Sequence, residues 1–324
     1  MDAKTIRYYL NNTAQGASAR NLLSTTSDYT VAIFNYISGQ TLSCNFGQRP
    51  FSYTPPSGFL ALNTQNLPTP TIAKGNQYFD ATLYTGTGAA RSVTNSGAMQ
   101  PDLVWVKGRS TAYSHYLADA VRGTGRVLSS DSTGAEIVSA TTVTAFNADG
   151  FSLGTEVGLN NNTTTYVGWQ WKEGATQGFD IVTYTGNGTS NRQISHSLGV
   201  TPAMIIVKVR STTNNWRVWH QRLTGSTYYL GLNQTAAEAT SSTVFNGQSS
   251  TTFTVGNDPS VNVNAGTFVA YLFAAVAGYS AFGSYTGNGS ADGPFVFTGF
   301  RPRYVMFKTH INTGGKSCSC FLML

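Results

Sequence analysis

Three short stretches set the organisation of this chain: Tyr84-Thr-Gly-Thr-Gly88, Tyr184-Thr-Gly-Asn-Gly188 and Tyr285-Thr-Gly-Asn-Gly289. After each stretch come a proline, five mostly apolar residues and then, about twenty residues beyond the stretch, a lysine. These lysines are Lys107, Lys208 and Lys308, which are 101 and 100 residues apart. A period this regular indicates a duplicated structural unit more than a single dedicated active site.

The composition favours strands over helices. Only 10% of the 324 residues are charged, against roughly 25% in an average soluble protein, and 34 residues are glycine. Long surface helices need Glu, Lys, Arg and Ala in quantity, whereas a chain rich in Thr, Asn and Gly suits strands joined by tight turns. We therefore expect an all-β fold, and a repeat of about 100 residues is the size of one β-sandwich.

The stretch after each proline is predicted to be a central strand. A short, continuous apolar run is typical of a strand that is buried on both faces. The last strand of the first repeat alternates instead, and we expect Val167, Trp169 and Trp171 to form its core face. The three central strands are expected at Leu103–Val106, Met204–Val207 and Tyr304–Phe307.

The Tyr-Thr-Gly-x-Gly motif is interpreted as the end of a strand followed by a turn. Such a turn needs a positive φ angle at glycine. A phosphate-binding loop is excluded, because no helix follows the motif and no Lys-Ser/Thr pair completes it.

These patterns predict tandem β-sandwich-like repeat modules between two incomplete segments. The first 65 residues lack the repeat, but 31–37 and 41–46 are predicted strands. After His310 the sequence stops following the repeat, which favours a truncated or frameshifted gene. The expected segments are a partial β domain (1–65), a linker (66–78), a first repeat (79–178), a second repeat (179–279) and a truncated third repeat (280–324).

Charge and hydropathy exclude several functions. The net charge of +6 comes from few acids (14) against 20 bases, and no run of Lys or Arg exceeds two residues, so we expect no nucleic-acid partner. No apolar run approaches the 18 or so residues of a membrane span, and the first thirteen residues lack the apolar segment of a signal peptide.

Without His-x-x-x-His or Cys-x-x-Cys spacing, we expect no metal and no cofactor. The three cysteines, Cys44, Cys318 and Cys320, do not suggest a disulfide framework.

Aromatic side chains are the best candidates for a ligand-binding site. Flat apolar rings beside Arg and Asn can hold sugars or protein loops. The alternative is that Trp216 and Val218 alternate into the core of an ordinary strand. The candidate residues are Trp216, Arg217, Trp219 and His220 in the second repeat, with Tyr113 and Tyr116 in the matching stretch of the first.

The acidic residues give little support for a catalytic site. A glycosidase needs two carboxylates. Glu136 and Glu238 recur in register, as do Asp80 and Asp180, which favours a turn or capping role used twice. We predict no catalytic residues, and a polysaccharide depolymerase is the enzymatic alternative.

One segment resembles a known family. Cys44-Asn-Phe-Gly-Gln-Arg-Pro-Phe51, with Tyr53-Thr-Pro-Pro-Ser-Gly-Phe59 after it, is similar to the end of SPRY-like domains in tailed-bacteriophage proteins. In those proteins a strand ending in Asn-Phe-Gly closes a concanavalin-like sandwich. The repeats also resemble the uncharacterised modules that follow such domains in phage tail or fibre proteins. Only about 60 residues match the SPRY-like domain, so we expect its amino-terminal part to be missing.

The resemblance implies a virion-associated structural or host-recognition role. We expect a tail or fibre component that is assembled in the host cytoplasm, released by lysis, and binds other virion proteins and a host-surface glycan or protein. Several weak sites in tandem raise avidity without new contacts, and a homo-oligomer is compatible with this role. A purely structural spacer and a prophage-encoded adhesin are the remaining alternatives.

Overall fold

The protein is described from a computed structural model, which covers residues 70–313 and 316–323 and parts of the first 69 residues (9–11, 13–14, 41, 43–45, 49–55, 57 and 61). The chain divides into two compact units, 1–69 and 70–324. Among the described residues, no helix is both long and apolar enough to cross a membrane.

In the first unit, β1 (Tyr9–Leu10) pairs antiparallel with β2 (Thr13–Ala14). The strand expected at 31–37 lies outside the described residues. Thr41 and residues 43–45 are described and are not in a strand, so the prediction of a strand over 41–46 is wrong at these positions. Here the Asn45 side chain accepts a hydrogen bond from the Arg49 backbone N–H at 3.3 Å, which closes a turn.

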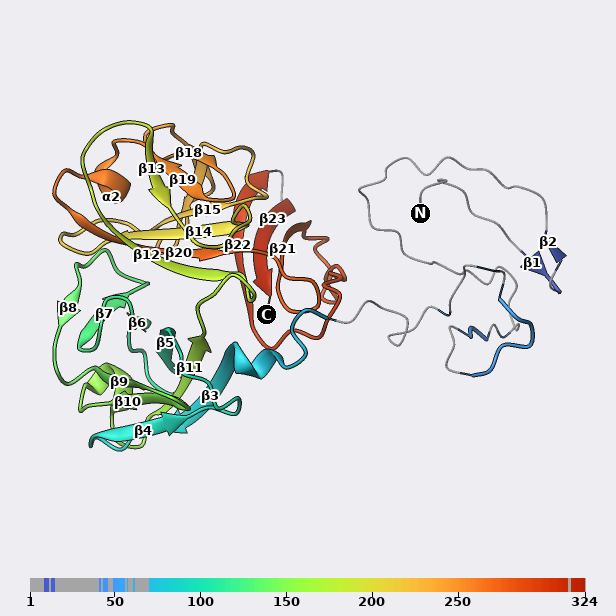
Figure 1. Cartoon of the computed structure of the whole chain (residues 1–324), viewed down its shortest axis with the longest axis horizontal. Coiled ribbons are helices and arrows are strands. Elements are labelled where there is room, and N and C mark those ends of the chain that lie inside the picture. Colours follow the sequence, from blue (N-terminus) through green and yellow to red (C-terminus); the bar gives the residue numbers. More distant parts are fainter. Residues whose placement is uncertain are drawn as a thin grey trace. The chain divides into compact units, whose positions relative to one another are not determined.

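The regular secondary structure of the second unit is almost all antiparallel strand, as the composition predicts, and the first two repeats have the same topology (Figure 1). The first repeat has a six-stranded sheet in the order β3-β11-β5-β6-β7-β8 and a three-stranded sheet in the order β4-β10-β9. The second repeats this as β12-β20-β14-β15-β16-β17 and β13-β19-β18.

The elements of the first repeat follow the 3-10 helix η2 (Gly75–Gln77). They are β3 (Phe79–Thr85), β4 (Arg91–Thr94), β5 (Leu103–Gly108), β6 (Tyr116–Asp119), β7 (Arg126–Ser129), β8 (Ile137–Val138), β9 (Val143–Asn147), β10 (Gly150–Leu153), α1 (Val157–Asn160) and β11 (Thr165–Trp171). Those of the second repeat are β12 (Phe179–Thr185), β13 (Arg192–Ser195), β14 (Met204–Val209), β15 (Arg217–His220), β16 (Tyr228–Gly231), β17 (Ala239–Thr240), β18 (Phe245–Gln248), β19 (Thr252–Val255), α2 (Pro259–Asn262) and β20 (Thr267–Phe273).

The Tyr-Thr-Gly-x-Gly motif ends the first strand of each repeat, as predicted. The second glycine of the motif has φ near +70° in all three copies (Gly88, Gly188 and Gly289). The first glycine serves a different purpose, because its backbone passes very close to the loop before the last strand. A Cβ on Gly86 would lie 2.1 Å from the Asn161 carbonyl oxygen, and one on Gly186 would lie 2.0 Å from that of Val263.

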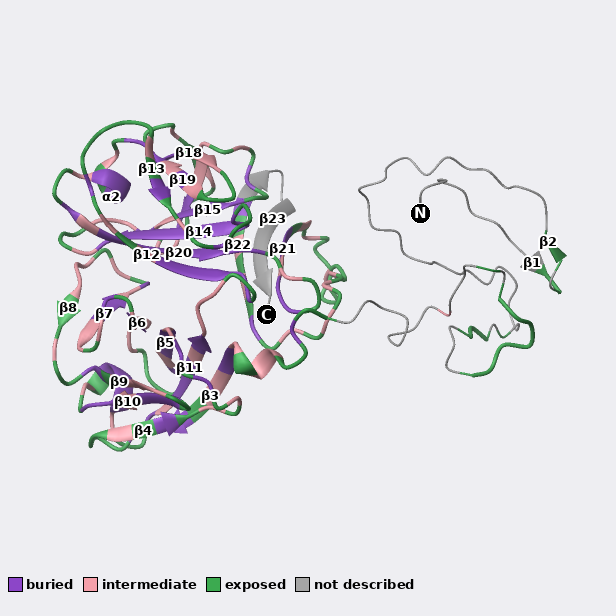
Figure 2. Cartoon of the chain, viewed as in Figure 1, coloured by how far each residue is buried: buried purple, intermediate pink, exposed green. Residues whose placement is uncertain are grey.

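The central strands of the first two repeats are buried on both faces, as expected, and so are the last strands of these repeats. The third prediction, a buried central strand at Tyr304–Phe307, is wrong: β22 (Val305–Thr313) lies at the edge of its sheet, and Val305 and Phe307 are exposed. On β11, Tyr166 and Gln170 are fully buried, and Tyr166 packs inside the first sandwich with Val104 and Phe151. Trp171, on the opposite face, belongs to a second cluster that the first repeat shares with the other two. Assigning the core to one face of this strand was therefore incomplete: one face fills the sandwich and the other fills the space between repeats. Figure 2 shows β14 of the second repeat in the colour of buried residues, and every residue of β20 but the first is buried as well.

The third repeat forms a three-stranded sheet, β21-β23-β22, from β21 (Ala281–Thr286), β22 (Val305–Thr313) and β23 (Lys316–Met323). The tail that departs from the repeat forms β23, which lies between the other two strands, as β11 and β20 do in their sheets. Its register is also the same. Cys320 pairs with Lys308, just as Val269 pairs with Lys208 and Val167 with Lys107.

The interface between the first two repeats recurs between the second and third. The Lys208 ammonium donates to the Thr133 carbonyl at 3.0 Å, and Lys308 donates likewise to Gln234. The Glu136 N–H donates to the Arg210 carbonyl at 2.8 Å, and the Glu238 N–H to that of His310 at 2.8 Å. One mode of docking is therefore used twice along the chain.

The third repeat also contacts the first. Arg303 forms an ion pair with Asp80 at 3.2 Å, and the Tyr304 ring lies 5.5 Å from that of Trp171. Each of the three repeats thus packs against the other two (Figure 1).

Candidate functional site

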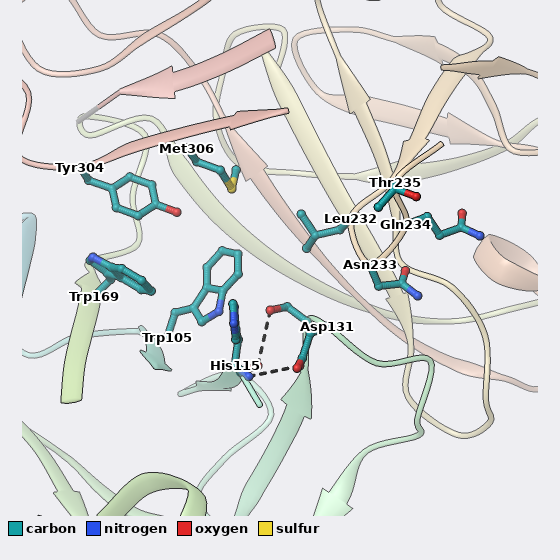
Figure 3. A pocket seen from close by; sticks show the side chains of 11 residues that line it. Trp105, His115, Asp131, Trp169, Leu232, Asn233, Gln234, Thr235, Tyr304 and Met306 are labelled. Atoms are coloured by element: carbon teal, nitrogen blue, oxygen red, sulfur yellow. Dashed lines mark hydrogen bonds between the residues drawn. The ribbon is translucent and has the colours of Figure 1, made fainter. Parts of the chain in front are cut away.

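A cavity of about 400 Å³ opens where the three repeats meet (Figure 3). This volume is within the range of small-molecule sites. The lining comes from all three repeats: Trp105, His115, Ser130, Asp131 and Trp169 from the first, Leu232, Asn233, Gln234 and Thr235 from the second, and Tyr304 and Met306 from the third.

Three aromatic side chains form one wall of the cavity. Trp105 and Trp169 are direct cross-strand partners on β5 and β11, and their rings are 6.3 Å apart at 81°. Tyr304, which precedes β22, packs edge-on against Trp169 at 5.5 Å. Trp169 is half-buried, whereas only 7% of the surface of Trp105 and 8% of that of Tyr304 is exposed. The wall is therefore rigid, apolar and partly open.

Polar groups stand on the same wall. The buried Trp105 Nε1 has no hydrogen-bond partner anywhere in the part of the chain that the structure describes. A buried donor without a partner is costly, and a ligand oxygen would satisfy it. Figure 3 shows the Tyr304 hydroxyl pointing into the cavity. Burial raises the pKa of Tyr304, so this hydroxyl keeps its proton and can donate.

Figure 3 shows His115 beside Trp105, with Asp131 next to it. The His115 backbone N–H donates to the Asp131 carboxylate at 3.1 Å. Burial lowers the pKa of His115 and the nearby Lys107 ammonium lowers it further, against the opposing effect of Asp131. At pH 7 the imidazole is therefore neutral and offers one donor and one acceptor.

Comparison of the repeats explains why the cavity is open at the first one. Trp105 corresponds to Ile206, Trp169 to Tyr271 and His115 to Trp216. In the second repeat the first repeat packs over the equivalent positions, and Trp216 Nε1 donates to the Ser129 carbonyl at 2.9 Å. Tyr271 donates through its hydroxyl to the buried Asp119 at 2.7 Å. The face that docks in the second repeat lines the cavity in the first.

The residues predicted from sequence fall into two groups. Trp216, Trp219 and His220 are buried, so they present no exposed ring to a ligand, and the core alternative is what the structure shows for Trp216. Arg217 lies 4.7 Å over the Tyr229 ring and donates to the Ser260 hydroxyl at 2.9 Å.

Tyr113 and Tyr116 are half-buried and pack against the first sandwich, on either side of His115 in the sequence. The structure does not bring the two groups together in one site. Sequence reasoning missed Trp105, Trp169 and Tyr304. One available signal was that two tryptophans of the first repeat become Ile206 and Tyr271 in the second.

The recurring acids have structural roles in both copies. Asp80 accepts the Ser96 N–H at 2.6 Å, and Asp180 accepts that of Ser197 at 2.5 Å, so the expected turn role is used twice. Glu136 forms ion pairs with Arg122, Arg126 and Arg210. Within the described ranges, no three His, Cys, Asp or Glu side chains are grouped as metal ligands would be.

The chain belongs to a family that is described only as a domain of unknown function (DUF7483), whose match spans residues 74–316. No curated protein and no solved structure matches the chain. The family match covers the first two repeats, the third as far as the start of β23, and every residue that lines the cavity.

Proposed function

We propose that this protein is a bacteriophage tail or fibre component that attaches to the host surface, and that the aromatic cavity binds a surface glycan. The observation that carries the ligand class is the wall of Trp105, Trp169 and Tyr304, with a buried indole N–H that lacks a partner among the described residues. Sugars present apolar C–H faces that stack on aromatic rings and hydroxyls that accept such donors.

The virion role rests on the resemblance of the repeats to phage tail modules and on the repeated docking of one module on the next. Three modules that pack against one another form one body, on which a binding site can be presented. The partners would be other virion proteins and a host-surface glycan. A depolymerase, a structural spacer and a prophage-encoded adhesin are the competing functions.

Two experiments test the proposal. Immunogold labelling of purified particles with antibody to residues 79–278 is expected to mark the tail or its fibres. Label confined to soluble protein in the lysate would contradict the virion role.

Binding of the whole protein to host envelope polysaccharide is then measured by tryptophan fluorescence. Trp169→Ala should abolish binding, whereas Phe295→Ala, which removes an exposed aromatic that does not line the cavity, should not. New reducing ends would favour the depolymerase, and no affinity for cells or glycan would favour the spacer.

A further inference from the structure

The second repeat shows how its docking face grips a carboxylate. Arg210 donates to both oxygens of Glu136 in the first repeat, from Nε at 3.0 Å and from Nη2 at 3.0 Å. This two-point geometry is the strongest way in which a side chain binds a carboxylate. Lys208 adds hydrogen bonds to the Thr133 carbonyl at 3.0 Å and, within its own repeat, to that of Asn214 at 2.8 Å.

The first repeat carries the same two cations at the matching positions. Lys107 corresponds to Lys208, and its ammonium donates to the Tyr113 carbonyl as Lys208 does to Asn214. Arg109 corresponds to Arg210, but it is exposed and forms no ion pair with any residue of the described parts. The first repeat therefore has the same pair of cations, but among the described residues no carboxylate is bound to its arginine.

These cations adjoin the cavity. Trp105, Lys107 and Arg109 are alternate residues along β5 and just beyond it, so they follow one face of the sheet. Lys107 is close enough to His115, a lining residue, to lower the pKa of its imidazole. The basic pair does not itself line the cavity, but it continues the sheet face on which Trp105 lies.

We infer that Lys107 and Arg109 form a carboxylate subsite, and that the glycan bound in the cavity is acidic, with a uronic or sialic type of sugar. The inference rests on the proposed function, because it assumes that a glycan occupies the cavity. The sugar ring stacks on Trp169, a ring oxygen or hydroxyl accepts from Trp105 Nε1, and the carboxylate takes the place that Glu136 takes on Arg210.

One acid opposes this binding. Asp131 lines the cavity, is exposed and accepts the His115 backbone N–H. Its negative charge lies on the same surface as the incoming carboxylate, so its removal should strengthen binding of an acidic glycan. The effect of Asp131 is therefore opposite in sign to that of Arg109.

The test uses the whole protein and a panel of matched ligands: oligogalacturonate, oligomannuronate and sialyllactose, each beside its carboxyl-reduced form. Tryptophan fluorescence gives the dissociation constants. We expect at least one acidic glycan to bind about tenfold or more tightly than its reduced partner, since hydrogen bonds to charged groups are the stronger class. Added salt should reduce this preference.

Variants assign the effect to the subsite. Arg109→Gln should bring the affinity for the acidic glycan down to that of the reduced form, with an unchanged unfolding midpoint because Arg109 is exposed. Arg301→Gln removes the same charge from an exposed arginine that does not line this cavity and should have no effect. Asp131→Asn should tighten binding.

Several results would overturn the inference. Equal binding of acidic and reduced glycans, or of neutral glycans alone, refutes the carboxylate subsite and leaves the proposed function standing. Failure of every panel glycan and of host polysaccharide refutes both. A peptide with the sequence 231–239 contains Glu238, the equivalent of Glu136. If this peptide binds and no acidic glycan does, the face that carries Lys107 and Arg109 binds a protein loop instead.

Discussion

Replacement of Glu136 by glutamine tests whether charge pairing holds the first two repeats together. Glu136 lies at the centre of a network in which its oxygens meet Arg122 at 2.9 Å, Arg126 at 3.0 Å and Arg210 at 3.0 Å. Only 7% of its side chain is exposed, and the Arg122 side chain is fully buried. Glutamine keeps the shape but removes the charge.

The expected loss follows from burial. The pair with Arg126, which is 40% exposed, contributes at most about 1 kcal/mol. Removal of one partner from a buried pair costs about 3–5 kcal/mol, because the other charge is left uncompensated. Arg122 retains Asp119 at 2.5 Å, so we expect a total near the lower end, about 3 kcal/mol.

The assay is urea unfolding of the whole protein at pH 7, and the matched control is Glu238→Gln. Glu238 occupies the equivalent position of the second repeat, but its carboxylate accepts from Thr224 and has no ion pair within the described ranges. The control should lose less than about 1 kcal/mol. A loss below about 0.5 kcal/mol for Glu136→Gln, or an equal loss in both variants, would refute the reasoning.

The same network predicts an acid transition. Burial by itself raises the pKa of Glu136, but hydrogen bonds from Arg210 and Arg122 outweigh it and hold the pKa below its usual value. A depressed pKa contributes stability above the unfolded value, near 4.5, that is lost as the pH falls through the folded value. The difference between wild type and Glu136→Gln should therefore shrink below about pH 4.5.

Three further predictions concern other parts of the second unit. Trp216→Phe removes the indole N–H from the Ser129 and Ser132 carbonyls together with part of the buried ring, so urea unfolding should show a loss of at least about 1–3 kcal/mol, and an unchanged midpoint would contradict the role of that donor. Burial, and then the neighbouring Asp180, raise the pKa of Glu173 to about 7, and a raised pKa contributes stability below the unfolded value that is lost as the pH rises through 7. Thermal unfolding between pH 4.5 and 7 should therefore show a smaller decline for Glu173→Gln than for wild type, and parallel curves would refute the coupling. Truncation before β23 leaves β21 and β22 without their shared neighbour, so amides of β21 should exchange faster with solvent while those of β14 do not change, and equal protection would argue against this pairing.

Local pattern was enough to predict the elements of each repeat. The apolar runs around Val104 and Ile206 form central strands, and the second glycine of each Tyr-Thr-Gly-x-Gly motif has the predicted positive φ. These features depend on nearest neighbours along the chain, namely side-chain alternation and the steric limits of the backbone. Copies of one pattern must fold alike, which is why the first two repeats share a topology.

Local sequence patterns were not enough to predict the candidate site. Trp216 and Trp105 are both aromatic residues on or beside strands of a large sheet, yet one is fully enclosed by the preceding repeat and the other lines a cavity. Local sequence does not determine which of them is covered, because burial depends on whether another repeat packs against that face. The same holds for the two equivalent arginines: Arg210 has Glu136 opposite it, whereas Arg109 has no acid opposite it among the described residues.

The tail is a second case. Residues after His310 do not follow the repeat, yet β23 takes the position and register of β11 and β20. The sequence by itself determined the all-β class, the period and the turns, because these are set by short-range sterics and hydropathy. Only the tertiary structure decided which faces meet, which charges are paired and where a cavity is left, because those depend on contacts between residues about a hundred positions apart.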